Sequence, residues 1–276
     1  MTVEAQERAI PSVTRLVLFL AAIAALICIG SPAAAQPSSG EPSEASRTLL
    51  EASDAIGSVR GARGRTSRGV LRIRYLASGR VDVPQGNGGW MTREVEQLAM
   101  EMHYGQPAMR ADYQFDDGER VILVLSGDLT WNETTPGTGA VRADVEADQL
   151  GWQVWSTPQG ALWAALDAEE GDPDSISLTQ HGDKKELRFS RGGMPIVITL
   201  DANHLPESVR VEINHAIVGE TTAETRFLNY KDWELLDVLF PENIVRTMDG
   251  REVMDLTVSE FRSNPYVVFP VPDSIQ

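Results

Sequence analysis

Apolar and polar side chains alternate with a period of two in many short stretches between Val70 and Phe261, and this pattern constrains the fold most strongly. A period of two places successive side chains on opposite faces of a β-strand. The pattern predicts strands at 70–75, 95–104, 111–115, 120–125, 175–179, 186–190, 196–201, 208–214, 221–232, 244–248 and 252–261. Because the connections are short, we expect an antiparallel meander.

Two details of the pattern give local predictions. The pair Asp249-Gly250 stands between two alternating stretches and is the strongest hairpin signal in the chain. In the stretch 95–104, residues two apart should face the same side, so Met100, Met102 and Tyr104 are expected to point together.

Two helices are predicted among the strands. The first covers 43–56, and the second begins near 156–158, where Thr157 can act as N-cap and Pro158 suits the first helical position. The acidic stretch 169–174 is expected to end the second helix. Because so few helices cannot cover both faces of so wide a sheet, we predict an α+β fold that is mainly antiparallel β. Its large curved sheet, like half a barrel, should hold two or three helices on its concave side.

The first 35 residues have the layout of a secretory signal. Two arginines precede an apolar run at 16–29, and small residues follow at 31–35. The run has about 14 residues, whereas a helix that spans a bilayer needs roughly 20. We therefore predict a signal peptide at 1–35 cleaved near Ala35, a linker at 36–42 and a single β-rich domain at 43–276, periplasmic or secreted. An uncleaved anchor is the weaker alternative.

Cysteine and charge exclude several functions. Cys28 is the only cysteine and lies in the predicted signal peptide, so the mature protein would have no disulfide, thiolate metal site or cysteine nucleophile. Lipid attachment at Cys28 is the weaker alternative, because the residues before it lack the small side chain of a lipoprotein signal. The formal net charge of −16 argues against a nucleic-acid partner. Contact of the basic stretch 60–68 with a membrane would be only transient.

No recognisable catalytic or metal motif is present in the sequence. None of the four histidines, His103, His181, His204 and His215, is paired at ligand spacing. The acidic stretch 169–174 lacks the glycine and final glutamate offsets of a calcium loop. Nucleophile-elbow, phosphate-loop and dinucleotide motifs are also missing. We predict no catalytic residue, no metal site and no cofactor.

Three tryptophans lie close together around the second predicted helix. Trp152, Trp155 and Trp163 fall within twelve residues, and large aromatic side chains can line an apolar ligand cavity or fill a core. Both interpretations stay open. If a ligand pocket exists, we expect these three tryptophans to line it, with Met100 and Met102 opposite.

An ordered set of segments resembles a known protein class. The segments are 100–110 (MEMHYGQPAMR), 155–165 (WSTPQGALWAA), 218–232 (VGETTAETRFLNYKD), 240–245 (FPENIV) and 253–258 (VMDLTV). Over roughly residues 45–265 they resemble the β-rich N-terminal region that precedes the catalytic domain in certain exported metallo-β-lactamase-fold hydrolases. The His-x-His-x-Asp-His motif of those hydrolases is absent here, so no catalytic residue can be transferred.

The expected architecture also resembles the curved sheet of periplasmic lipoprotein carriers of the LolA/LolB kind, which implies an apolar concavity closed by helices. The leading hypothesis is therefore a non-enzymatic periplasmic binding or accessory domain for a hydrophobic ligand or lipoprotein. The alternatives are an accessory domain or fragment of a metallo-β-lactamase-fold hydrolase system, or a module that docks a separate hydrolase. An apolar pocket of at least ~300 Å³ would favour the ligand, and a polar cleft that groups the histidines would favour an enzyme.

Overall fold

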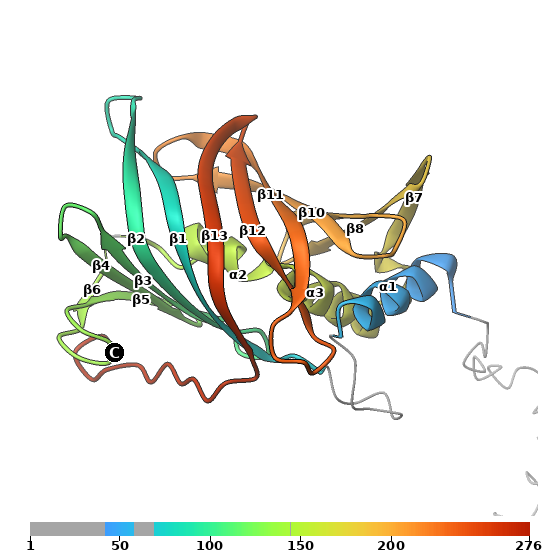
Figure 1. Cartoon of the computed structure of the whole chain (residues 1–276), viewed down its shortest axis with the longest axis horizontal. Helices are drawn as coiled ribbons and strands as arrows, with labels where there is room; N and C mark the ends of the chain where they lie inside the picture. Colours follow the sequence, from blue (N-terminus) through green and yellow to red (C-terminus); the bar gives the residue numbers. More distant parts are fainter. Residues whose placement is uncertain (1–41, 58–68, 144) are drawn as a thin grey trace, which may run out of the picture. The chain divides into compact units, whose positions relative to one another are not determined.

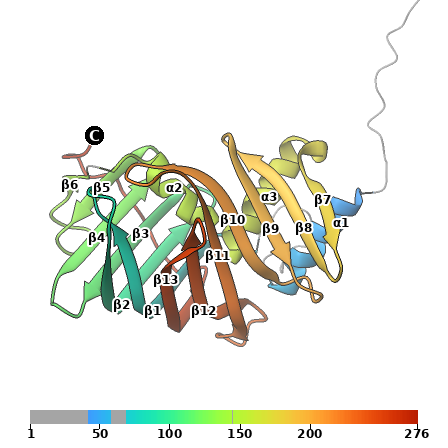
Figure 2. The ribbon, with the colours of Figure 1, turned by 90° about the horizontal axis from the view of Figure 1, so that it is seen from above.

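Within the described residues, 42–57, 69–143 and 145–276, thirteen strands form one antiparallel sheet (Figures 1 and 2). These residues come from a computed structural model. The predicted signal peptide, Cys28 and the basic stretch 60–68 lie outside them. The strands are β1 (Arg72–Pro84), β2 (Trp90–His103), β3 (Ala108–Phe115), β4 (Arg120–Ser126), β5 (Leu129–Glu133), β6 (Val141–Arg142), β7 (Ser177–His181), β8 (Lys184–Arg191), β9 (Met194–Leu200), β10 (Pro206–His215), β11 (Gly219–Asp232), β12 (Leu239–Met248) and β13 (Arg251–Ser263).

The order of the strands follows the chain in two runs. The sheet reads β6-β5-β4-β3-β2-β1-β13-β12-β11-β10-β9-β8-β7, so each run is a meander of neighbours and β1 pairs with β13 to join them. This confirms the predicted antiparallel meander. The turn between β12 and β13 has positive φ at Asp249 (45°) and Gly250 (80°), as a two-residue hairpin of the predicted kind requires.

Three α-helices accompany the sheet in the described part of the chain, which agrees with the two or three predicted, although the sequence placed only two of them. They are α1 (Glu44–Ala55), α2 (Asp148–Trp155) and α3 (Pro158–Gly171), followed by a short 3-10 turn (Pro173–Ser175). Ser43 caps α1 and Thr157 caps α3, each by accepting a backbone N–H three residues on. Two predictions need correction: α2 precedes the predicted start, and α3 continues through the first part of the acidic stretch to Gly171.

Local irregularities in β1 accompany the curvature of the sheet. The register of β1 shifts against β13 after Leu76 and against β2 after Ala77. Gly79 stands next to these bulges with a φ of 145°, and a Cβ there would lie 2.1 Å from the carbonyl oxygen of Asp255. Bulges bend a strand and increase its twist, so this point lets the middle of the sheet fold over the helices.

The main core lies between the concave side of the sheet and the helices (Figure 2). Met100, Met102 and Tyr104 are all buried there, which confirms that they share a face. The Tyr104 hydroxyl lies 2.9 Å from Oγ1 of Thr157, so the strand side meets the α3 cap through a buried hydrogen bond. The predicted fold class, a large curved antiparallel sheet with helices on its concave side, is confirmed.

A second, smaller core lies on the opposite face of β4 and β5. Ile122, Val124 and Trp131 are buried there with Ile275 from the end of the chain. The segment after β13 returns across this face (Figure 1), and Phe269 packs against the cluster. Both faces of this part of the sheet are therefore covered by protein.

Candidate functional site

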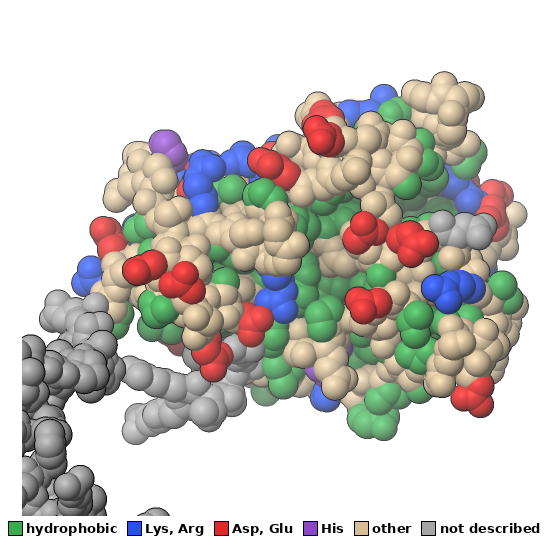
Figure 3. Space-filling model, turned by 180° about the vertical axis from the view of Figure 1, so that it is seen from behind, with side chains coloured by type: hydrophobic (Ala, Val, Ile, Leu, Met, Phe, Trp, Pro, Cys, Tyr) green, Lys and Arg blue, Asp and Glu red, His purple; other side chains and the backbone are tan. Residues whose placement is uncertain are grey.

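The best candidate site is an open, mainly apolar pocket of about 430 Å³ at one end of the concave side. The ends of β1 to β4, the β12–β13 hairpin, helix α2 and the turn after β10 surround it. Figure 3 shows a face of the molecule on which hydrophobic side chains gather in a hollow with acidic side chains near it. The pocket is lined by Val81, Asp82, Val83, Pro84, Arg93, Tyr113, Phe115, Val121, Val145, Gln149, Leu150, Trp152, Gln153, His215, Ala216, Ile217, Arg246, Met248, Val253 and Met254.

The apolar walls follow from the periodicities of their elements. On strands, Tyr113 and Phe115 are two residues apart and face the pocket together. On α2, the residues that line the pocket are Gln149 and Gln153, which lie one helical turn apart, together with Leu150 and Trp152. The volume lies within the ~300–1,000 Å³ that small-molecule pockets usually have.

Arg246 is the polar side chain that distinguishes this pocket. It comes from β12, where Ile244, Arg246 and Met248 point to the concave side. Its Nε donates a hydrogen bond to Oγ1 of Thr225 at 3.0 Å, and its guanidinium lies 4.6 Å from the centre of the Trp152 ring. Burial lowers the pKa of Arg246, and the nearby phenols of Tyr113 and Tyr75 partly offset that shift. The guanidinium nevertheless stays charged, since arginine is not deprotonated in proteins.

A small void of about 10 Å³ lies directly behind Arg246. Tyr113, Gln153, Arg246 and Met254 line both this void and the larger pocket, so the two are neighbours. Burial raises the pKa of Tyr113, and Arg246 partly offsets the rise, so the phenol keeps its proton at neutral pH. The inner end of the pocket therefore holds a cation and hydrogen-bond donors, whereas its remaining walls are mainly apolar.

The structure separates the five predicted ligand-binding residues. Trp152 lines the large pocket, and Met100 and Met102 line the small void behind it. Trp155 and Trp163 line neither space: their rings stack with centroids 5.9 Å apart, and the Arg191 guanidinium lies 4.1 Å from the Trp155 ring. Whether any of these residues binds a ligand stays a prediction.

The sequence did not point to Arg246, to the C-terminal end of β1 or to the N-terminal end of β2 as parts of a site. The predicted strand 244–248 already placed a charged residue between two apolar residues of the same face. A charge at an inward position was the signal that could have identified it. The residues Val81–Pro84 were missed because the extended β1 continues well beyond the alternating stretch.

The four histidines do not come together. His103 accepts a hydrogen bond from the backbone of Gln106, and His204 lies 3.0 Å from a carboxylate oxygen of Glu51. His181 lies at the end of β7, and His215 lies at the rim of the large pocket. Across the described residues, no group of three or more histidine, cysteine, aspartate and glutamate side chains is placed to hold a metal ion.

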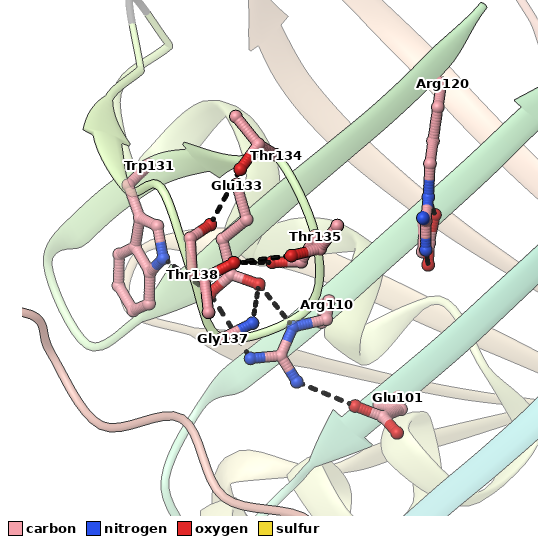
Figure 4. A network of polar contacts seen from close by, with 10 residues as sticks. Glu101, Arg110, Arg120, Trp131, Glu133, Thr134, Thr135, Gly137 and Thr138 are labelled. Atoms are coloured by element: carbon pink, nitrogen blue, oxygen red, sulfur yellow. Dashed lines mark hydrogen bonds and ion pairs between the residues drawn. The ribbon is translucent and has the colours of Figure 1, made fainter.

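A polar network on β3 and β5 is the other prominent charged cluster (Figure 4). Arg110 donates to Glu133 at 3.0 Å and to Glu101 at 2.9 Å, and Glu133 also accepts from Trp131 Nε1 and the backbone N–H of Gly137. Burial raises the pKa of Glu133, but these donors outweigh burial and hold the pKa below its usual value. A carboxylate so well satisfied is a poor general base, and we interpret the network as structural.

Comparisons with known proteins give the following findings. No protein-family model matches the sequence, and no curated protein matches it. The structure is similar to a LolA-superfamily protein from Nitrosomonas europaea, with a TM-score of 0.44 and 9% identity over 80% of this chain and 94% of that chain. It is also similar to the Mycobacterium tuberculosis lipoprotein LppX, with a TM-score of 0.32 and 10% identity over 81% of this chain and 98% of that chain. The resemblance to metallo-β-lactamase-fold hydrolases stays a prediction.

In the described part of the chain, the helices are too short or too polar for any of them to span a bilayer.

Proposed function

We propose that this domain is a non-enzymatic binding protein that holds a hydrophobic, lipid-like ligand in the pocket between α2 and the concave side of the sheet. The observation that carries the proposal is the pocket itself, about 430 Å³ and lined mainly by apolar side chains. Its volume exceeds the ~300 Å³ at which a ligand cavity was expected.

The pocket walls suit an apolar ligand better than a polar one. Val83, Phe115, Val121 and Met254 line the pocket from four different strands, so a ligand would meet apolar surface on several sides. Binding would be driven by removal of this surface from water, which is worth roughly 25 cal/mol for each Å² buried. Because the pocket is open to solvent, a ligand can enter without unfolding of the domain.

The setting that we propose is the periplasm or the exterior of the cell, which depends on the predicted signal peptide at 1–35. In that compartment a lipid or the acyl chain of a lipoprotein would need protection from water. The same pocket would accommodate either apolar moiety.

Native mass spectrometry of the purified mature protein tests for a bound ligand. We expect a co-purifying lipid, and removal of that lipid should restore binding of a fluorescent apolar probe. The variant Val121→Trp fills the pocket from β4 and should weaken probe binding by about tenfold or more. Leu123→Trp is the matched control, because Leu123 lies two residues along the same strand and does not line the pocket. Equal probe affinities for the wild type and Val121→Trp would exclude this pocket.

A further inference from the structure

We propose that the ligand is a single-chain amphiphile with a carboxylate head group, a fatty acid, whose carboxylate pairs with Arg246. This inference rests on the proposed function and names the chemical class of the ligand. It starts from the guanidinium of Arg246, which faces the pocket without an anionic partner among the described residues.

Arg246 has unused hydrogen-bonding capacity. A guanidinium has five N–H donors, and its Nε uses one of them on Thr225. Its stacking on Trp152 occupies a face of the guanidinium and not its N–H edges. No carboxylate of the described residues forms an ion pair with it. Because a charged group set among mainly apolar walls is normally paired, an acceptor is expected in the pocket.

The other charged groups of the pocket already have partners. Arg93 pairs with Asp117 at 2.8 Å and with Glu119 at 2.9 Å. Asp82 accepts from Arg251 at 2.7 Å and from Thr92 at 2.7 Å. Arg93 and Asp82 therefore each have an oppositely charged partner, whereas Arg246 has no such partner among the described residues.

The surroundings of Arg246 also suit a carboxylate. A guanidinium fork matches the two oxygens of a carboxylate in a bidentate arrangement. Tyr113 and Gln153 line the space beside it and can donate further hydrogen bonds. With the head group at this end, the hydrocarbon tail would lie along Phe115 and Val121.

One guanidinium balances one negative charge, and this favours a fatty acid over a phosphomonoester. A phosphomonoester carries about −1.5 to −2 charges at neutral pH and would leave charge uncompensated. A carboxylate carries a single negative charge there.

The test compares head groups on one tail length. Laurate and lauryl alcohol are titrated into delipidated mature protein at neutral pH by calorimetry, with lauroyl lysophosphatidylglycerol as a third ligand of single negative charge. We expect the wild type to bind laurate at least about tenfold more tightly than the alcohol or the lysolipid. Arg246→Met should remove the preference for laurate over the alcohol while the alcohol still binds.

Arg226→Met is the matched control, because Arg226 follows Thr225 on β11 but is exposed on the other face of the sheet. It removes the same charge and should keep the preference for laurate. Equal binding of laurate and alcohol by the wild type would overturn the head-group assignment and leave the apolar pocket intact. Tighter binding of the lysolipid would overturn the carboxylate in favour of a phosphodiester. If none of the three ligands binds, both the head-group assignment and the proposed function fail. The wild-type comparison holds even if Arg246→Met does not fold.

Discussion

The hydroxyl of Thr157 at the start of α3 should make a large contribution to the free energy of unfolding, because it both caps the helix and joins it to the sheet. Oγ1 of Thr157 accepts the backbone N–H of Gly160 at 3.1 Å as the helix N-cap. It also lies 2.9 Å from the Tyr104 hydroxyl, and both side chains are buried. The perturbation that isolates this group is Thr157→Ala, studied alone and with Tyr104→Phe.

The expected cost has two parts. Loss of an N-cap hydroxyl costs about 1 kcal/mol, and a buried phenol left without a partner costs about 1–3 kcal/mol more. We therefore expect Thr157→Ala to lower the free energy of unfolding by about 2–4 kcal/mol, and Tyr104→Phe by only about 1 kcal/mol. In a domain of this size, each kcal/mol lowers Tm by about 2–4 °C.

The stability of the double variant tests whether the two hydroxyls are coupled. When both hydroxyls are absent, no unpaired group remains at this contact, so Thr157→Ala with Tyr104→Phe should cost less than the two single effects together. The difference, about 1–2 kcal/mol, is measured by urea unfolding of all four proteins. Thr157→Ser is the control, because it keeps the hydroxyl and should cost less than about 1 kcal/mol. Strict additivity of the two single effects would refute a coupled hydrogen bond.

Two further predictions concern stability. Glu133→Gln should lower Tm at neutral pH. Because the folded-state pKa of Glu133 lies below its usual 4.5, the contribution of its charge is complete above about pH 4.5 and is lost as the pH falls through the lower value. The difference in Tm between Glu133→Gln and the wild type should therefore become smaller as thermal scans are made at progressively lower pH. A difference that stays constant with pH would contradict this. Gly160→Ala should destabilise by about 1–3 kcal/mol or more, since a Cβ there would lie 2.1 Å from the carbonyl oxygen of Val154. Gly151→Ala on α2 meets nothing within 4 Å and should be neutral or stabilising in the same thermal scan.

Much of the fold could be predicted because most strands of the sheet pack one face against a core. The alternation that this produces predicted most of the strands, and Asp249-Gly250 predicted the hairpin between β12 and β13 in the middle of the sheet. Helix α2 was missed because its eight residues are too short to show a periodic pattern and carry no side-chain cap at Ala147. Strand β5 was missed for a related reason, since it is brief and the C-terminal segment buries its outer face.

The site was less predictable because a pocket forms where neighbouring helices and strands leave a space between them. The tryptophans near α2 are similar in sequence context, yet Trp152 lines the pocket while Trp155 and Trp163 stack on each other in the core. No local pattern separates them, because the difference depends on where α2 and α3 lie against a sheet whose strands are distant in sequence.

Arg246 shows the opposite case, in which a departure from the local pattern marks the site. Within 244–248, the alternation would favour an apolar residue at every inward position, and a charge there is costly unless something pairs with it. Natural sequences keep such conflicts mainly where function requires them. Thr225 and Trp152 satisfy only part of the guanidinium, and the rest faces an apolar space. A ligand with one anionic group and a long apolar tail would resolve both the unpaired charge and the exposed hydrocarbon walls, so the two features that make the pocket unfavourable when empty together select its occupant.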